Sequence, residues 1–178
     1  MQFLKDIGFV IKRTNVGEAD KFITIYTQNN GKVEVMARGV RKIKSRRGGA
    51  VELVNLIKFQ AVKTRKNFIL TEVETIDNFE QIKNDIASVQ LVFLVCELLN
   101  ALCPLGQVNS EVFNLLKFTF DNIEKPKMGQ QTFDFQIKLL ESLGFWNTKN
   151  TINSDAELRN YIESIIEKKV KTKLYFEN

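Results

Sequence analysis

The chain has 178 residues, 44% hydrophobic and 26% charged, which is typical of a globular protein forming one compact unit or two small domains. It contains no histidine, which excludes Ser-His-Asp and Cys-His nucleophile systems and histidine-ligated zinc or iron sites. Because only Cys96 and Cys103 remain as thiol ligands, we also expect no structural zinc site and no cofactor.

Both cysteines are expected to be buried, reduced thiols, since seven residues along one helix place them about 10 Å apart, too far for a disulfide. The N-terminal residues lack the apolar core of a signal peptide. The uncharged stretches at residues 86–96 and 98–110 fall short of the about 20 apolar residues of a membrane span. We therefore expect a cytoplasmic protein without membrane contact.

The first 80 residues have the alternation of β-strands and no helical period. Alternation predicts strands over residues 7–11, 22–26, 33–37, 53–61 and 68–73. Asn30-Gly31 predicts a hairpin turn between the second strand and the third. Five short antiparallel strands on a small core favour a barrel, and the OB-fold is the common five-stranded barrel.

From residue 82 onward the period is helical. A long helix that is apolar nearly all round, ended by Pro104 and Gly106, is expected at the centre of a bundle. Its predicted common face carries Ile86, Val89, Phe93, Cys96 and Cys103. Ser110 is expected to cap a second helix, Gly144 to end a third, and a capping box at residues 154–157 to open a fourth.

The expected fold class is therefore α+β, with two domains. An OB-fold nucleic-acid-binding barrel is expected over residues 1–80, and an all-α helical bundle that binds partners over residues 81–178.

Positive charge is concentrated in the predicted barrel, where residues 1–80 hold 15 Lys and Arg against 9 Asp and Glu. Residues 38–47 carry six cations and no acid before Gly48-Gly49, which indicates a mobile loop. Such a loop attracts nucleic acid, whereas a merely solvated charge run is the alternative. The six cations expected on phosphates are Arg38, Arg41, Lys42, Lys44, Arg46 and Arg47. The second-rank candidates, at strand ends, are Lys12, Arg13, Lys63, Arg65 and Lys66.

Other strand residues have both a structural and a functional interpretation. The aromatic residues Tyr26, Phe59 and Phe68 are expected mainly in the core, with base stacking as the alternative. Glu18 and Asp20 are expected to fix the turn after the first strand, or to pair with Lys21 or Arg38, rather than to act as a catalytic pair.

Several short runs resemble the RecO family of bacterial recombination mediators. Residues 17–21 read G-E-A-D-K, an apolar strand and G-K-V at residues 31–33 follow, and residues 37–42 read A-R-G-V-R-K. Residues 139–145 read L-L-E-S-L-G-F, which is similar to the family's L-L-x-x-L-G-F. Many members carry a four-cysteine zinc module after this run. Here no cysteine follows it, so we expect a short form in which the module is deleted.

The resemblance implies a non-enzymatic, nucleoid-associated protein of DNA repair and recombination in the RecFOR pathway. Its barrel would bind single- and double-stranded DNA and anneal complementary strands. It would also help load RecA onto DNA covered by single-strand-binding protein. The implied partners are RecR, the acidic C-terminal tail of single-strand-binding protein and, indirectly, RecA.

The end of the chain offers one guess for a partner site. The predicted last helix ends with four cations close to its C-terminus, Lys168, Lys169, Lys171 and Lys173. The simpler interpretation is that these cations interact with the negative end of the helix dipole. The functional alternative is that they bind the acidic C-terminal tail of single-strand-binding protein.

Two rivals to the mediator function remain. One is a generic OB-fold module that binds RNA or single-stranded DNA without mediator activity. The other is a metal-dependent nuclease using Glu72 and Glu74, which no acidic cluster elsewhere in the sequence supports.

Overall fold

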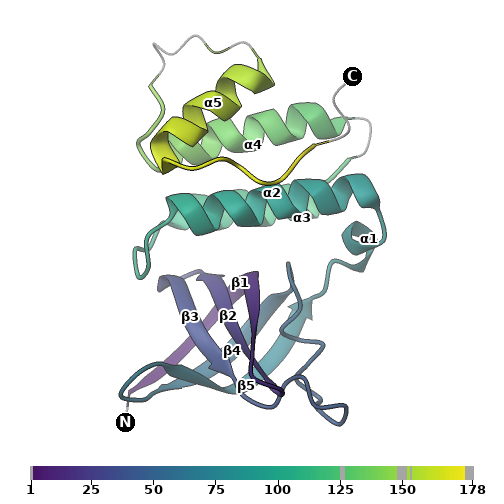
Figure 1. The fold of residues 1–178 in the computed structure, drawn as a ribbon, viewed down its shortest axis with the longest axis vertical. Coiled ribbons are helices and arrows are strands. Elements are labelled where there is room, and N and C mark those ends of the chain that lie inside the picture. The colour runs from purple at the N-terminus through teal and green to yellow at the C-terminus, as the bar shows by residue number, and fades with distance from the viewer. Residues whose placement is uncertain (1, 125–126, 148–151, 153, 175–178) are drawn as a thin grey trace. The chain divides into compact units, whose positions relative to one another are not determined.

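The structure, a computed structural model, describes residues 2–124, 127–147, 152 and 154–174 (Figure 1). The chain forms two compact units, one of Met1–Phe79 with Pro104–Ser110 and one of Glu80–Cys103 with Glu111–Asn178. The first contains a closed five-stranded barrel and the second contains helices, which confirms the α+β class. The single boundary expected near residue 80 did not anticipate that residues 104–110 group with the barrel.

The strands surround the barrel in the order β1-β2-β3-β5-β4. Neighbours pair antiparallel except β3 and β5, which pair in parallel at Val35 with Phe68 and at Met36 with Ile69, and so close the barrel. The end of β3 therefore lies beside the start of β5. The strand bounds are β1 (Phe3–Val16), β2 (Asp20–Thr27), β3 (Gly31–Ala37), β4 (Leu56–Lys63) and β5 (Phe68–Asp77).

The long strand β1 serves two neighbours. It pairs with β4 through residues 3–9 and with β2 through residues 8–16, and its register with β2 shifts between Val10 and Lys12. A Cβ on Gly8 would lie 2.6 Å from Cγ2 of Ile25, closer than real side chains approach. Glycine at this position therefore permits β1 to lie tightly against β2.

The predicted hairpin between β2 and β3 is confirmed, and a buried carboxylate holds its turn. Gly31 has the positive φ of +63° that glycine adopts easily. Asp6 accepts hydrogen bonds from the backbone N–H of Asn29 at 3.0 Å and from the side-chain amide of Asn30 at 2.6 Å. The turn is thus fastened to β1.

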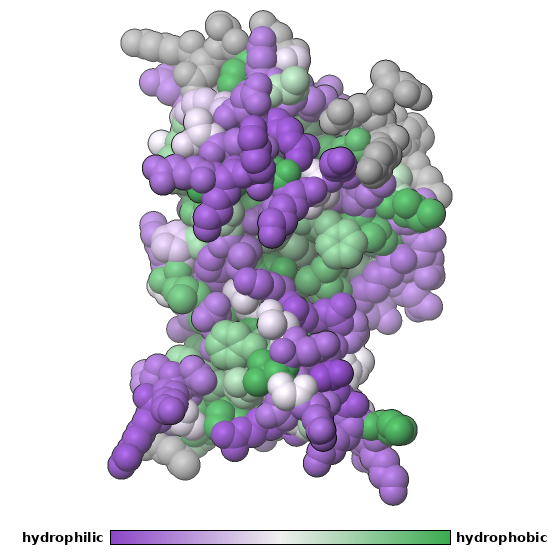
Figure 2. Space-filling view, in the orientation of Figure 1, coloured by the Kyte–Doolittle hydropathy of each residue, from purple (hydrophilic) through white to green (hydrophobic). Residues whose placement is uncertain are grey.

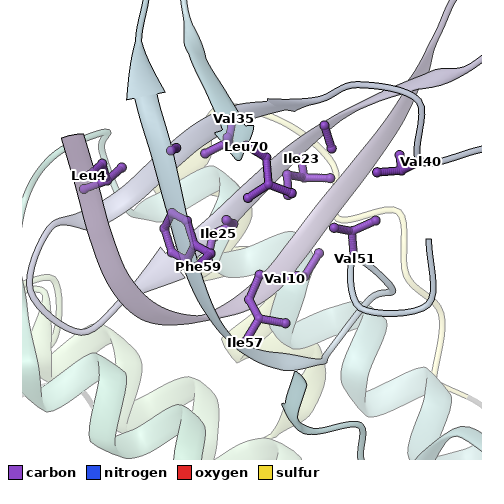
Figure 3. Close-up of a cluster of buried hydrophobic side chains, with 12 residues drawn as sticks. Leu4, Val10, Ile23, Ile25, Val35, Val40, Val51, Ile57, Phe59 and Leu70 are labelled. Atoms are coloured by element: carbon purple, nitrogen blue, oxygen red, sulfur yellow. The ribbon is translucent and has the colours of Figure 1, made fainter. Parts of the chain in front are cut away.

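One cluster of buried apolar side chains in the barrel draws its members from all five strands (Figure 3). Val40 and Val51 belong to it although they lie in the segment between β3 and β4, which has no regular secondary structure. That segment is therefore attached to the barrel at two points. The residues of this cluster are Leu4, Val10, Ile23, Ile25, Val35, Ala37, Val40, Val51, Ile57, Phe59, Ala61 and Leu70.

The helices are α1 (Glu80–Lys83), α2 (Ile86–Leu102), α3 (Ser110–Asp121), α4 (Met128–Ser142) and α5 (Asp155–Ile166). The capping box before α5 is confirmed, since the Ser154 hydroxyl accepts the Glu157 N–H at 3.3 Å. Gly144 follows α4 with a φ of +77°, as predicted. Within the described ranges, the helices are all too short or too polar to cross a membrane.

The predicted face of α2 needs correction. Ile86 and Phe93 are exposed, by 80% and 51%, because a helix apolar nearly all round gives periodicity no basis for choosing one face. Cys103 follows the helix as its C-cap, so the helix ends before Pro104. Both cysteines are buried and form no disulfide among the described residues, as predicted, and burial raises the pKa of the Cys96 thiol to about 12.

Candidate nucleic-acid interface

A groove of about 470 Å³ lies on the barrel beside the closure of β3 and β5. It brings together three cations, Arg38 after β3 and Arg65 and Lys66 in the β4–β5 turn, with one acid, Asp20. Faces of OB barrels near the first and last hairpin loops are common sites for oligonucleotides. The groove is lined by Asp20, Met36, Arg38, Thr64, Arg65, Lys66, Asn67 and Ile69.

The only acid lining the described groove already has a structural task. Asp20 accepts a hydrogen bond from the backbone N–H of Gly39 at 2.8 Å, which holds the turn after β3. Asp20 thus holds the turn after β3, whereas the sequence predicts that it holds the turn after β1 or pairs with Lys21 or Arg38. The guanidinium of Arg38 and the ammonium of Lys66 have no ion pair within the described residues, so the groove carries uncompensated positive charge.

Beyond Arg38, residues 41–47 form a loop with a closed neck, defined here as the basic loop. Arg47 donates hydrogen bonds to the carbonyl oxygens of Arg38 at 3.1 Å and Leu70 at 3.3 Å. Gly48 lies so close to Val40 that a Cβ on it would be 2.7 Å from the Val40 carbonyl oxygen. The predicted loop is confirmed, and these contacts fasten both of its ends to the barrel.

The cations of the basic loop fall into two groups. Arg41 donates to the Gly17 carbonyl oxygen at 2.9 Å, and Arg47 closes the neck, so both hold the loop in place. Lys42, Lys44 and Arg46 are exposed and form no ion pair in the part of the chain that the structure describes. These three are the loop cations whose side chains are not already hydrogen-bonded to other described residues, although Arg41 and Arg47 also keep their charge because their partners are neutral carbonyl oxygens.

The second-rank cations also fall into two groups, those that contact another side chain and those that line the groove or are exposed. Arg13 is ion-paired with Glu52, which pairs in turn with Lys21 at 3.1 Å. Partial burial disfavours the charged form of Glu52, but the two cations outweigh it and hold its pKa below the usual range. Lys63 lies over the ring of Phe68, 4.5 Å from its centroid. Arg65 and Lys66 line the groove, and Lys12 is exposed.

The strand aromatics differ in accessibility. Tyr26 and Phe59 are only 1% and 3% exposed, which supports their interpretation as core residues. The Tyr26 hydroxyl donates to the carbonyl oxygen of Asn109 at 3.5 Å. Phe68 is half-buried beneath Lys63 and starts β5. Of the three, Phe68 alone offers part of a ring to a ligand.

The cations at the end of the chain lie after α5, not on it. Helix α5 ends at Ile166, and residues 168–174 run back along α2 (Figure 1). The carboxylate of Glu97 on α2 accepts the backbone N–H groups of Lys171 at 2.7 Å and Thr172 at 2.9 Å. Burial opposes the charge of Glu97, but these bonds hold its pKa below the usual range.

Within this terminal segment the four lysines are not equivalent. Lys169 is ion-paired with Glu163 at 2.6 Å, whereas the side chains of Lys168, Lys171 and Lys173 form no ion pair among the described residues. Lys168 and Lys169 directly follow Glu167, the C-cap of α5, so the helix-dipole explanation still applies to them. Lys171 and Lys173 lie farther along, in the part of the segment that is bonded to Glu97.

The face drawn in Figure 2 is mostly hydrophilic, with scattered hydrophobic patches. Glu72 and Glu74 are exposed on β5. No three potential metal ligands among His, Cys, Asp and Glu come together in the residues that the structure describes. Residues 148–151 and 153, where a zinc module would follow, lie outside the described residues.

Two family models match the chain. The model described as Recombination protein O N terminal matches residues 1–79, and the one described as Recombination protein O C terminal matches residues 83–148. Together they cover most of the chain. The barrel with the groove thus falls almost entirely within the first match.

Curated relatives give the same result. The DNA repair protein RecO of Symbiobacterium thermophilum is 31% identical over 140 residues, which cover 78% of this chain and 55% of the relative. RecO of Acetivibrio thermocellus is 29% identical, over 82% of this chain and 59% of the relative. RecO of Clostridium acetobutylicum is 32% identical, over 82% of this chain and 60% of the relative. The aligned part is thus little more than half the length of these relatives.

Proposed function

The chain belongs to the RecO family, and on that premise we propose that it is a non-enzymatic DNA-binding protein of recombinational DNA repair. The observation that carries the proposal is the groove, which Arg38, Arg65 and Lys66 line. The acid among its described lining residues, Asp20, already accepts a hydrogen bond from Gly39. Phosphate oxygens are the natural partners of such a cluster, because guanidinium groups bind them through paired N–H donors.

A DNA strand in the groove would continue over the basic loop. Lys42, Lys44 and Arg46 add unpaired charge to that of the groove. Arg13 contributes less, because Glu52 neutralises it. Arg41 and Arg47 keep their charge, but their hydrogen bonds to backbone carbonyl oxygens hold their side chains against the protein. If about five phosphates are neutralised, the logarithm of the affinity for single strands falls with the logarithm of salt concentration at a slope of roughly −3 to −4.

Annealing follows from the same charge and requires no catalytic residue. Neutralising phosphates lowers the repulsion between two complementary strands and raises their local concentration on the protein. We extend the proposal to the family's mediator activity, in which the protein helps RecA replace single-strand-binding protein on single-stranded DNA. The cellular location that fits this activity is the cytoplasm, at the nucleoid.

The proposed protein partners are RecR and the acidic tail of single-strand-binding protein, with RecA acting indirectly. In the proposed partner-binding helical domain, Lys168, Lys171 and Lys173 are the terminal cations that an acidic peptide would meet. Lys169 is a weaker candidate because Glu163 already neutralises it.

The groove can be tested with two charge-matched variants of the full chain. Arg65→Gln with Lys66→Gln removes two groove cations, and Lys5→Gln with Lys58→Gln removes two exposed cations of the same barrel that do not line the groove. The groove variant should bind single-stranded DNA more weakly, with a salt slope shallower by about 1.4. The control variant should keep most of the affinity.

Equal losses in the two variants would mean that binding follows net charge alone, and the groove would then not be the site. Normal binding to bare single strands, but no effect on strands coated with single-strand-binding protein, would leave a generic single-strand-binding module without mediator activity.

A further inference from the structure

The tip of the basic loop is an apolar side chain. Ile43 is fully exposed, at 104%, and is flanked by the exposed cations Lys42 and Lys44. Among exposed large hydrophobic residues in the described part of the chain, none has a higher exposed fraction. An isoleucine in this position contributes nothing to the core, so its side chain is free to contact a ligand.

The backbone presents Ile43 on a tight turn. The N–H of Ser45 donates to the carbonyl oxygen of Lys42 at 2.8 Å, and the N–H of Lys42 donates to that of Gly39 at 3.2 Å. Ile43 is the second residue of the turn that Lys42 begins and Ser45 ends. Side chains at such positions point away from the turn, which places the branched side chain at the end of the loop.

The neck of the loop is firm enough to hold this tip against a ligand. Arg47 is bonded to two carbonyl oxygens, Val40 is buried, and Gly48 lies against Val40. Compact loops with closed ends of this kind are frequently functional. The loop therefore presents one apolar group between cations on a fixed base, and does not need to be ordered on binding.

We infer that Ile43 is a wedge for duplex DNA, entering between stacked base pairs while Lys42 and Lys44 bind the phosphates on either side. Proteins that kink duplexes insert aliphatic side chains between base steps in this way. Isoleucine has no aromatic face on which an unpaired base could stack, so the duplex is the better partner. The inference rests on the proposed DNA-binding function: the loop cations bind phosphates of single strands and of duplexes alike, whereas Ile43 acts on the duplex alone.

A membrane surface fits the loop less well. Binding in the plane of a membrane requires an extended apolar face, and here a single aliphatic residue stands among cations. Anionic vesicles are nevertheless the appropriate competitor in a test, because they offer the same negative charge without base pairs.

The test uses Ile43→Ser, with Ile86→Ser as the matched control, since Ile86 is also exposed but lies on α2. The substrates are a short duplex with 2-aminopurine at a central step and the corresponding single strand. Wild type should raise the 2-aminopurine fluorescence of the duplex by unstacking it, and Ile43→Ser should abolish the rise and weaken duplex binding about tenfold. Ile43→Leu should retain both, and Ile86→Ser should behave as wild type.

Single-strand affinity should change less than about twofold in Ile43→Ser, because phosphate contacts carry it. The two proposals therefore fail in different experiments. The wedge is tested by duplex binding of Ile43→Ser, whereas the groove would be refuted by normal single-strand binding of the Arg65→Gln, Lys66→Gln variant. Unchanged duplex affinity and fluorescence in Ile43→Ser would overturn the wedge. So would a loss of binding to anionic vesicles with duplex binding intact.

Discussion

Gly48 and Gly49 make a matched pair for testing the closed neck of the basic loop. A Cβ on Gly48 would lie 2.7 Å from the Val40 carbonyl oxygen, whereas a Cβ on Gly49 would meet nothing within 4 Å. Replacing either glycine by alanine removes similar freedom from the unfolded chain, worth about 0.4–1 kcal/mol of stability. Only Gly48→Ala adds a clash, and overpacking of this kind costs about 1–3 kcal/mol.

The difference between the two variants therefore isolates the steric cost. Gly49→Ala should be as stable as wild type or slightly more so, and Gly48→Ala should be less stable than Gly49→Ala by about 1–3 kcal/mol. In calorimetry, 1 kcal/mol corresponds to roughly 2–4 °C in melting temperature at this chain length. Equal melting temperatures would refute the closed neck. If the neck opens, Gly48→Ala should also lose part of the duplex unstacking although every cation and Ile43 remain.

Two further predictions concern the half-buried carboxylates of Glu52 and Glu97. Glu52→Gln should release Arg13 from its ion pair, so the affinity for single-stranded DNA at low salt should rise. The slope of log affinity against log salt concentration should steepen by about 0.7. An unchanged slope would show that Arg13 does not reach the strand. Glu97→Gln should loosen residues 168–174 and cost about 1 kcal/mol, allowing for solvent exposure, with faster proteolysis of that segment as the readout. The pKa of Glu97 is lower in the folded state than its unfolded-state value of 4.5. The contribution of Glu97 to the free energy of unfolding is therefore complete above pH 4.5 and is lost as the pH falls through the folded-state pKa. At acid pH, wild type and Glu97→Gln should thus have the same stability.

The local features of the fold could be predicted from the sequence. Strand alternation, the turn before Gly31, the capping box at Ser154 and the end of α4 at Gly144 all depend on residues within a few positions of one another. The buried face of α2 could not be predicted, because the helix carries apolar side chains nearly all round its circumference. The course of residues 168–174 also depends on a distant partner, Glu97.

The candidate site was predicted only in part, for the same reason. The charge run at residues 38–47 was visible, but the groove forms because the parallel pairing of β3 with β5 brings Arg38 near Arg65. Nothing in the alternation of the strands indicates that pairing. Nor does the sequence show that Arg13 is neutralised by Glu52, which lies 39 residues away.

The most direct test of the account is the annealing rate of two complementary oligonucleotides coated with the cognate single-strand-binding protein. The account predicts that wild type and the Lys5→Gln, Lys58→Gln control accelerate annealing, and that the Arg65→Gln, Lys66→Gln variant does so much less. If wild type gives no acceleration, or if both double variants retain the full rate, the claim that this groove captures DNA strands for repair is contradicted.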